Sequence, residues 1–227
     1  MAAGEGRRLR PLTERWPKPV LPIDGRPVLG TLLRQLADSG VARVTVVSGH
    51  LANQVEELVG DGSAWGLEAV LATQPRADGS ADAVRRALAA GAQPPALVTA
   101  ADTVYTTGDI ERFAAAVADA PGALAYRRGH PISKAKPGVR VDRGLITAVV
   151  DLDGANPFTS APLWSLGAEL VPYLDGLPGP PFELKDAYER AIADGLAVVG
   201  VEIGPTRDLT DPLDLVLENF PYLKRAP

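Results

Sequence analysis

The sequence predicts an α/β protein with a mostly parallel, mixed sheet and helices on both faces. In the first part of the chain, short apolar runs rich in β-branched residues alternate with segments of helical periodicity. These runs are nearly continuous in hydrophobicity, as expected for parallel strands buried on both faces. After about Arg128 the rhythm changes to a hairpin pattern followed by further strands, which predicts antiparallel additions in the second half.

The first half of the chain shows these signals in turn. Segment 27–40 places its apolar residues on one helical face, with Pro27 suited to the first turn and Gly40 to the stop. Ser80 is expected to cap a later helix. The expected helices are 27–40, 51–60, 80–91 and 110–120. The expected strands are 42–49, 67–74, 96–102 and 122–128.

In the second half, two short strands separated by Arg143-Gly144 predict a hairpin, and Thr210 is the expected cap of a closing helix. The expected strands are 138–142, 145–153, 161–167 and 196–204. The expected helices are 183–195 and 210–220. No long linker interrupts this order, so residues 1–227 are expected to form a single domain.

Composition excludes several classes of protein. The chain of 227 residues has a net charge of -5, which leaves no basic footprint for nucleic acid or an anionic membrane. With 0 cysteines there are no disulfides, thiolate zinc sites or cysteine nucleophiles. No apolar run reaches membrane-spanning length and no signal-peptide pattern is present, so a cytoplasmic location is expected.

The opening "GEGRRLRP" is the first candidate site. It is not a dinucleotide fingerprint, because Leu9 stands where a third glycine is needed, and it lacks the Gly-Lys-Ser/Thr of a P-loop. Its glycines nevertheless let the backbone approach an anion, and Arg7, Arg8 and Arg10 offer forks matched to phosphate oxygens. The prolines of "PKP" stiffen the backbone around Lys18. A substrate with several phosphates is expected.

Residues 2–29, "AAGEGRRLRPLTERWPKPVLPIDGRPVL", resemble the signature of the sugar-1-phosphate nucleotidyltransferases. The resemblance implies a Rossmann-like fold and a reaction of NTP with a sugar phosphate that gives NDP-sugar and pyrophosphate. It implies that the backbone of Ala3, Gly4 and Gly6 holds the nucleotide. Arg8 would steady the departing pyrophosphate and Lys18 would contact the phosphates. Arg7 is also expected at the nucleotide, where the family has a small hydroxyl residue.

The resemblance also implies Mg²⁺. Asp102 ends a hydrophobic run, and the family has a strand-end Gly-Asp there whose aspartate binds magnesium; here the pair is Ala101-Asp102. A second carboxylate is offered by Asp208, Asp211 or Asp214, and Asp208 resembles the acid of the family's late Trp-x-Asp segment. Asp102 and Asp208 are therefore the expected metal ligands.

The segment "ATQPRADGSADAV" resembles the part of the family that reads the base. The resemblance implies that Gln74 meets the base edge and that Gly79 and Ser80 lie near the ribose or base. The identity of the base stays open. His50, which also has a counterpart in the family, is most simply a structural hydrogen-bonding residue.

On the acceptor side, "FELKDAYERAI" resembles a family segment and implies that Glu183 binds sugar hydroxyls. The family's sugar-phosphate lysine has no counterpart in "VVDLDG", the corresponding stretch. Lys134 or Lys136 could substitute for it, although solvated loop lysines are the simpler interpretation. Residues 1–128 would then form the nucleotide half of the domain and residues 129–227 the acceptor half.

Two other functions stay open. One is a cytidylyltransferase that acts on a non-sugar phosphate such as phosphocholine or inositol phosphate, and the other is a nucleotide-binding regulator without turnover. A homo-oligomer is also left open. In the family an apolar strand precedes the glycine loop, and Met1 stands where its last residue should be. The first strand is therefore expected to be truncated, through a late start or a trimmed chain.

Overall fold

A computed structural model describes residues 1–129, 132, 137–220 and 223. It confirms the expected α/β class, with parallel and antiparallel pairing. The chain groups into two compact units. Unit 1 contains Met1–Ala77, Ala100–Tyr105 and Thr206–Pro227, and unit 2 contains Asp78–Thr99 and Thr106–Pro205. The single domain expected from the sequence stays a prediction.

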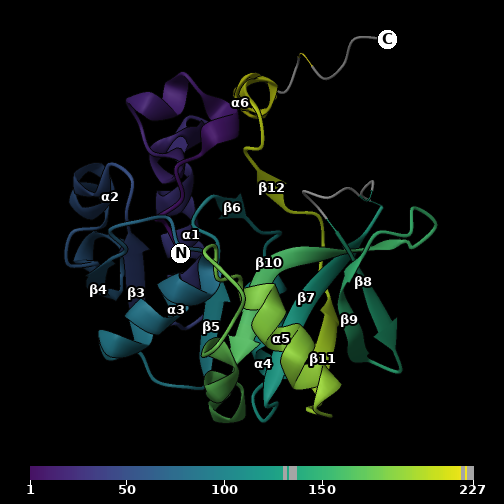
Figure 1. Cartoon of the computed structure of the whole chain (residues 1–227). Coiled ribbons are helices and arrows are strands. Elements are labelled where there is room, and N and C mark those ends of the chain that lie inside the picture. The colour runs from purple at the N-terminus through teal and green to yellow at the C-terminus, as the bar shows by residue number, and fades with distance from the viewer. Residues whose placement is uncertain (130–131, 133–136, 221–222, 224–227) are drawn as a thin grey trace. The chain divides into compact units, whose positions relative to one another are not determined.

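Unit 1 is built around a parallel pair of strands, β3 (Arg43–Ser48) and β4 (Glu68–Thr73), which lie side by side in Figure 1. The helices α1 (Val28–Asp38) and α2 (Ala52–Val59) contribute to the same hydrophobic core as β3. This core contains Ala2, Leu29, Leu33, Val46, Val55, Val59, Leu67 and Ala101. The apolar periodicity of the sequence therefore identifies the faces of these helices that become buried.

Met1–Ala3 runs beside β3. The Ala2 amide donates to the Val47 carbonyl over 2.8 Å, and Ala2 forms a parallel bridge with Ser48. On the other side, the Ala101 amide donates to the Met1 carbonyl over 2.9 Å. The glycine loop that follows thus begins from a segment held on both sides by backbone hydrogen bonds.

The rest of unit 1 consists of short elements. The 3-10 turns are Arg7–Leu9, Leu12–Glu14, Lys18–Val20 and Ser63–Trp65. The strands are β1 (Pro22–Ile23), paired with β2 (Arg26–Pro27), and β12 (Arg207–Asp208), paired with β6 (Thr103–Val104). The closing helix is α6 (Pro212–Asn219).

The expected cap of α6 is wrong by one residue. Asp211, not Thr210, is the N-cap, and its carboxylate accepts from the amides of Leu213 and Asp214. Asp214 completes a capping box by accepting from the Asp211 amide. A carboxylate satisfies these amides and also interacts favourably with the helix dipole.

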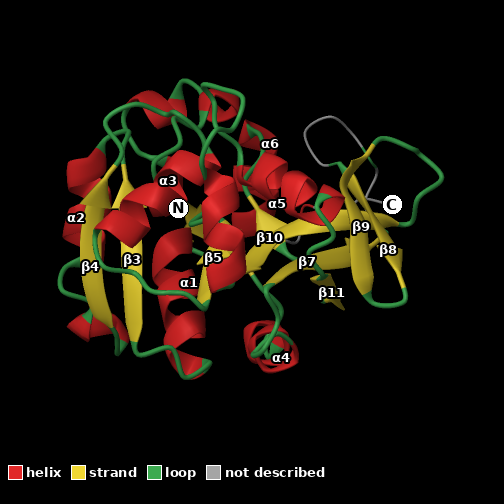
Figure 2. Ribbon diagram, turned by 60° about the horizontal axis from the view of Figure 1, so that its bottom comes forward, coloured by secondary structure: helices red, strands yellow, loops and turns green. Residues whose placement is uncertain are grey.

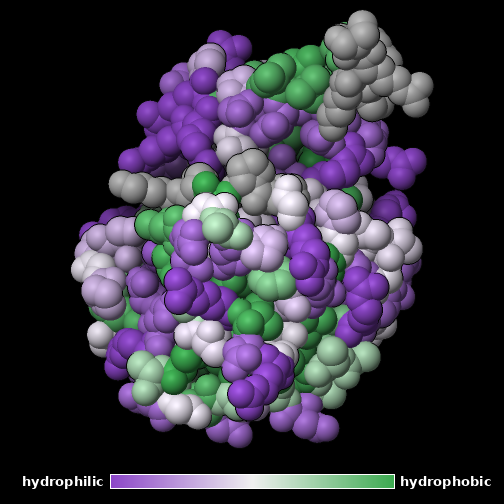
Figure 3. Space-filling model, turned by 90° about the vertical axis from the view of Figure 1, so that its right-hand side faces the viewer, coloured by the Kyte–Doolittle hydropathy of each residue, from purple (hydrophilic) through white to green (hydrophobic). Residues whose placement is uncertain are grey.

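Hydrophobic side chains of α6 are exposed. Leu213, Val216 and the C-cap residue Phe220 are exposed, whereas Leu215 packs against the buried cluster around Leu209. Figure 3 shows an apolar patch on the surface at the top of its view. Within the described residues, no helix has both the length and the apolar character needed to cross a membrane.

Unit 2 contains a mixed sheet in the order β5-β10-β7-β11-β9-β8. The strands are β5 (Ala96–Thr99), β7 (Gly122–Arg128), β8 (Gly138–Asp142), β9 (Leu145–Asp151), β10 (Phe158–Leu166) and β11 (Val198–Glu202). Its helical elements are α3 (Ser80–Ala89), α4 (Asp109–Ala116), the 3-10 segment Ala168–Leu174 and α5 (Leu184–Ala193). Figure 2 shows α5 and α4 on opposite faces of this sheet.

The strand order corrects one expectation. The first half of the sequence suggests that successive strands continue one parallel sheet, but β10 lies between β5 and β7 and is antiparallel to both. Among the described strands of this sheet, β11 and β7 are the one pair that runs in parallel. The antiparallel addition is therefore inserted into the middle of the sheet rather than attached to its edge.

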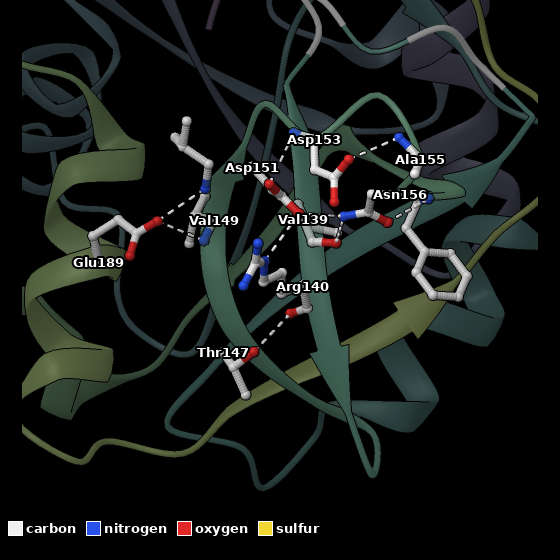
Figure 4. Close-up of polar contacts among 11 residues, drawn as sticks. Val139, Arg140, Thr147, Val149, Asp151, Asp153, Ala155, Asn156 and Glu189 are labelled. Atoms are coloured by element: carbon white, nitrogen blue, oxygen red, sulfur yellow. Dashed lines mark hydrogen bonds and ion pairs between the residues drawn. The ribbon is translucent and has the colours of Figure 1, made fainter.

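The hairpin of β8 and β9 is confirmed, with Arg143 and Gly144 at its turn. Both residues have positive φ, 48° and 81°, as a two-residue hairpin loop favours. At the other end of the hairpin, a polar network holds the chain after β9 (Figure 4).

Asp151 is the centre of this network. Its carboxylate accepts from Arg140 Nε at 3.0 Å, from the Asn156 amide group at 2.8 Å and from the Asp153 backbone amide at 3.0 Å. Together these donors lower the pKa of Asp151 to about 2, and the Asp153 amide contributes most. Glu189 of α5 holds the preceding residues by accepting from the amides of Val149 and Val150.

The first prediction concerns this carboxylate. Because the pKa of Asp151 is depressed in the folded chain from an ordinary value of 3.8 to about 2, its ionised form stabilises the fold above about pH 4. This contribution is lost as the pH falls from about 4 to about 2. Asp151→Asn should therefore be less stable than the wild type at pH 7, and the difference should shrink in this window. Urea unfolding from pH 7 to pH 2 measures it.

The matched control is Asp119→Asn, at an exposed position outside this network. It should follow the pH profile of the wild type throughout. A stability difference for Asp151→Asn that stays constant down to pH 2 would contradict the assignment.

Candidate functional site

The glycine loop of unit 1 combines open and constrained positions. At Gly4 a Cβ atom would meet no other heavy atom within 4 Å, so this glycine is not required by packing. Gly6 has φ 62°, and a Cβ there would lie 2.8 Å from Thr13 Cγ2. Gly6 is therefore needed for the turn, whereas Gly4 leaves an exposed backbone that another molecule can approach closely.

Two residues that the sequence analysis did not place in the site support this loop. The Thr13 hydroxyl donates to the Gly6 carbonyl over 3.0 Å. His50 Nε2 lies 2.6 Å from the Thr13 carbonyl, and the His50 amide donates to the Ala3 carbonyl. His50 is thus the structural residue that was expected. Thr13 lies within the motif of residues 2–29, and this position was the sequence signal that could have placed it in the site.

The arginines of the loop differ in their surroundings. Glu5 binds Arg7 through two contacts, from Nε at 2.7 Å and from Nη2 at 3.2 Å, and Arg10 lies 3.5 Å from the same carboxylate. The carboxylate raises the pKa of Arg7, and Arg7 in turn lowers the pKa of Glu5. Within the described part of the chain, the exposed Arg8 side chain has no such partner. Arg8 is therefore the guanidinium most available to a phosphate.

Lys18 and Asp102 form an ion pair. Both side chains are largely covered, with 15% and 23% of their surfaces exposed. Pro17 and Pro19 are buried on either side of Lys18, although Lys18 starts a 3-10 turn and not the extended geometry usual before proline. The structure thus brings these two predicted site residues into contact.

Asp208 lies next to this pair in the β12–β6 ladder, where it is the register partner of Thr103, the residue after Asp102. Its carboxylate accepts from the Thr210 hydroxyl over 2.9 Å. The neighbouring Arg207 binds Asp24 through two contacts and also pairs with Glu218. These carboxylates, Asp24 first, raise the pKa of Arg207. Arg207 therefore ties β12 to Asp24 and to Glu218 of α6.

These carboxylates fit a magnesium ion better than a transition metal. The described residues include no group of three or more His, Cys, Asp and Glu side chains that could hold a metal ion. Asp102, in the turn before β6, and Asp208, in the paired strand β12, offer only hard oxygen donors. Mg²⁺ commonly binds through one or two carboxylates and completes its coordination with water and substrate phosphates.

Gln74 is buried, with 4% of its surface exposed. Its backbone amide donates to the Ser48 carbonyl over 2.7 Å. Gly49 lies between Gln74 and the loop. A Cβ at Gly49 would lie 2.8 Å from the Ala3 carbonyl and 2.9 Å from the Gln74 carbonyl. The structure therefore brings the start of the glycine loop and the predicted base-reading glutamine together.

The remaining predicted residues, Gly79, Ser80 and Glu183, lie together in unit 2. The Ser80 hydroxyl donates to Glu183 Oε2 over 2.6 Å and accepts from the Leu184 amide at 2.7 Å. The expectation that Ser80 is the N-cap of α3 is therefore wrong. That position is Gly79, and no side chain caps this helix. The hydroxyl instead serves the start of α5.

Lys134 and Lys136 lie outside the described residues. The stretch expected to carry the sugar-phosphate lysine is the network around Asp151 (Figure 4), whose Asp151 and Asp153 carboxylates are engaged by neighbouring backbone and side-chain donors. This stretch supplies no cation at the position where the resemblance implies one.

As a whole, the unit 1 site can bind an anion. It offers an open backbone at Gly4, an exposed guanidinium at Arg8 and a confined ammonium at Lys18. The carboxylates of Asp102 and Asp208 can hold a divalent cation beside them. A polyphosphate with its metal ion is the ligand whose charges match this set.

Comparison with known proteins agrees with this chemistry. N-acetylmuramate alpha-1-phosphate uridylyltransferase of Neisseria meningitidis is 39% identical over 75 residues, or 33% of this chain and 32% of that protein. CMP-5'-(3-aminopropyl)phosphonate synthase of Streptomyces rubellomurinus is 32% identical over 215 residues, or 88% of this chain and 33% of that protein. The chain thus spans about a third of the length of these two relatives.

Among solved structures, one assigned as a glucose-1-phosphate thymidylyltransferase from Bacillus anthracis superimposes with a TM-score of 0.84. The match covers 100% of this chain and 94% of the other at 16% identity, so it concerns the fold. Residues 1–127, more than half of the chain, match the family model described as nucleotidyl transferase. The chain belongs to the nucleotidyl transferase family.

Proposed function

We propose that the protein is a Mg²⁺-dependent nucleotidyltransferase that transfers NMP from an NTP to a sugar 1-phosphate, with release of NDP-sugar and pyrophosphate. The observation that carries this proposal is the pairing of Lys18 with Asp102 in the same unit as the open glycine loop. A confined lysine and a candidate metal ligand in contact are what phosphoryl chemistry requires for charge stabilisation.

The reaction would proceed as an in-line displacement. An oxygen of the acceptor phosphate attacks the α-phosphorus of the NTP, and the bond from that phosphorus to the bridging oxygen of the β-phosphate breaks. Arg8 would stabilise the departing pyrophosphate and Lys18 the charge at the α-phosphate. The attacking phosphate is already ionised, so no general base is needed. When bound by Asp102 and Asp208, Mg²⁺ would supply further charge stabilisation.

A second acceptor class is favoured by two observations. The stretch around Asp151 and Asp153 has no lysine for a sugar phosphate, so an acceptor that is also held through its own ammonium group fits this chain. The relative that aligns with 88% of this chain is named as a CMP-aminopropylphosphonate synthase. Cytidylyl transfer to an aminoalkylphosphonate, or to a similar zwitterion such as phosphocholine, is therefore the alternative.

The second prediction separates these options. Wild-type protein is incubated with Mg²⁺ and UTP, dTTP or CTP, each with glucose 1-phosphate, N-acetylmuramate 1-phosphate, phosphocholine or 3-aminopropylphosphonate, and pyrophosphate release is measured. We expect release with at least one pair, and the pair identifies the acceptor class. Lys18→Ala should lower kcat at least about 100-fold, because a charge aimed at the reacting phosphate is lost.

The control is Lys185→Ala, which removes an exposed lysine in the first turn of α5 and should retain the wild-type rate. If the wild type releases no pyrophosphate with any pair, the proposed function is refuted. If nucleotide binds with Mg²⁺ but never turns over, the nucleotide-binding regulator becomes the better interpretation.

The third prediction concerns the metal. Since Lys18 and a metal ion would compete for Asp102, Lys18→Ala should bind Mn²⁺, used as a spectroscopic substitute, more tightly than the wild type by roughly fivefold in the absence of nucleotide. Asp102→Asn and Asp208→Asn should bind it more weakly. Electron paramagnetic resonance of free Mn²⁺ measures these affinities without turnover.

Asp119→Asn serves as the control, because this exposed carboxylate is far along the chain from both candidate ligands and should leave Mn²⁺ affinity unchanged. Equal affinity in the wild type and in Asp208→Asn would remove Asp208 from the metal site. Weaker binding by Lys18→Ala would show that Lys18 does not compete with the ion.

A further inference from the structure

Two turns of unit 2 that are a hundred residues apart in the sequence are joined by backbone hydrogen bonds. The Phe182 amide donates to the Asp78 carbonyl over 2.7 Å, and the Ala81 amide donates to the Phe182 carbonyl over 2.9 Å. Gly79 lies between these bonds. A Cβ there would overlap the Phe182 backbone, and Gly79 also has φ 105°. The contact between the turns therefore depends on the absence of a side chain at position 79.

Ser80 adds side-chain bonds to this contact. Its hydroxyl has one proton, and that proton is donated to Glu183 Oε2 over 2.6 Å. A lone pair of the same oxygen accepts from the Leu184 amide at 2.7 Å. Leu184 is the first residue of α5 and Glu183 is its N-cap, but the Glu183 side chain makes no capping bond. Ser80 thus accepts from the first amide of α5, and the Glu183 carboxylate does not cap this helix.

The Glu183 carboxylate is consequently held through one oxygen. Among the described residues, no hydrogen bond or ion pair is found for the other oxygen, Oε1. The side chain is half-buried, so it is neither solvated as a surface glutamate nor satisfied as a core residue. A carboxylate fixed in this way can accept from a hydroxyl or an ammonium group of a ligand without losing further rotamer entropy.

We propose that Ser80 is a positioning residue for Glu183 and acts on acceptor binding, in place of the nucleotide contact implied for it by resemblance. This inference rests on the proposed function, since it assigns Glu183 to the acceptor. It follows from the direction of the hydrogen bond: the hydroxyl proton is donated to Glu183 and is not available to a ribose or a base. Gly79 and the backbone bonds to Phe182 set the distance at which Ser80 does this.

The fourth prediction is a double-mutant cycle with Ser80→Ala, Glu183→Gln and both together, using the NTP and acceptor pair that the pyrophosphate screen identifies. Ser80→Ala should raise the KM of the acceptor about tenfold, as expected for loss of a hydrogen bond to a charged group. The KM of the NTP should stay within about twofold, which is the size of a surface effect. In the Glu183→Gln background, Ser80→Ala should have almost no further effect.

Ser80→Thr keeps the hydroxyl, so its KM for the acceptor should stay near the wild-type value. If the effect of Ser80→Ala came only from disturbed packing, the bulkier threonine would not be expected to preserve this KM. Lys185→Ala, in the first turn of α5, controls for general changes at the start of that helix. Thermal unfolding of each variant shows whether it is folded under assay conditions. If Ser80→Ala does not fold, the comparison is made between Ser80→Thr and Ser80→Cys, where the weaker donor should raise the KM of the acceptor.

The outcomes are distinguishable. A rise in the KM of the NTP with an unchanged KM of the acceptor would return Ser80 to the nucleotide. Independent effects of the two substitutions, which multiply in the double mutant, would show that Ser80 does not act through Glu183. Both results overturn the inference while the wild type still turns over. Absence of turnover by the wild type with every pair refutes the proposed function, and this inference fails with it.

Discussion

The backbone of Ala3 packs directly against Gly49, where a Cβ would lie 2.8 Å from the Ala3 carbonyl. This close approach allows Met1–Ala3 to continue beside β3, where the Ala2 amide donates to the Val47 carbonyl and Ala2 is the parallel bridge partner of Ser48. The rest of the candidate site depends on this alignment. It determines where the glycine loop starts, and the loop is then held by Thr13 and His50. Backbone contacts therefore place the start of the glycine loop, and the side chains of Thr13 and His50 hold the turn that follows.

The charges of the site are arranged locally, against the negative balance of the whole chain. Glu5 neutralises Arg7 and Arg10 on the surface, where such pairs contribute little to stability. Lys18 and Asp102 are more covered, so each reduces the cost of burying the other. A polyphosphate with a divalent cation would replace both interactions by a larger set of opposite charges. The site thus already contains partners for the charges that the proposed substrate would pair.

In unit 2, packing between α3 and α5 fixes the direction of one carboxylate, that of Glu183. The sheet brings α5 against β9 and β10, where Tyr188 packs on Trp164 and its hydroxyl donates to the Ser165 carbonyl. The start of α5 is then tied to the start of α3 by Ser80. The network of Asp151 closes the hairpin on itself and offers no lysine. In the proposed function, Glu183 therefore contributes a larger share of acceptor recognition than it would in a site where a lysine also binds the acceptor.

Local sequence determined a large part of this molecule. Helices α1 to α5, the buried strands and the Arg143-Gly144 hairpin follow from periodicity and turn chemistry, because these signals act between residues that are close in the chain. The glycine loop, Lys18 and Asp102 were found through a motif in which residue type and spacing both carry the chemistry. The structure describes those residues in one unit, as their proposed roles require.

Tertiary structure alone decided the insertion of β10 between β5 and β7, because strand order depends on pairing between distant segments and leaves no local pattern. It also decided the partner of Ser80. By sequence this serine is an excellent N-cap for its own helix, yet its hydroxyl bonds to Glu183 and Leu184, which the chain brings back after 103 and 104 residues. A hydroxyl has one proton to donate, and long-range packing determines which acceptor receives it.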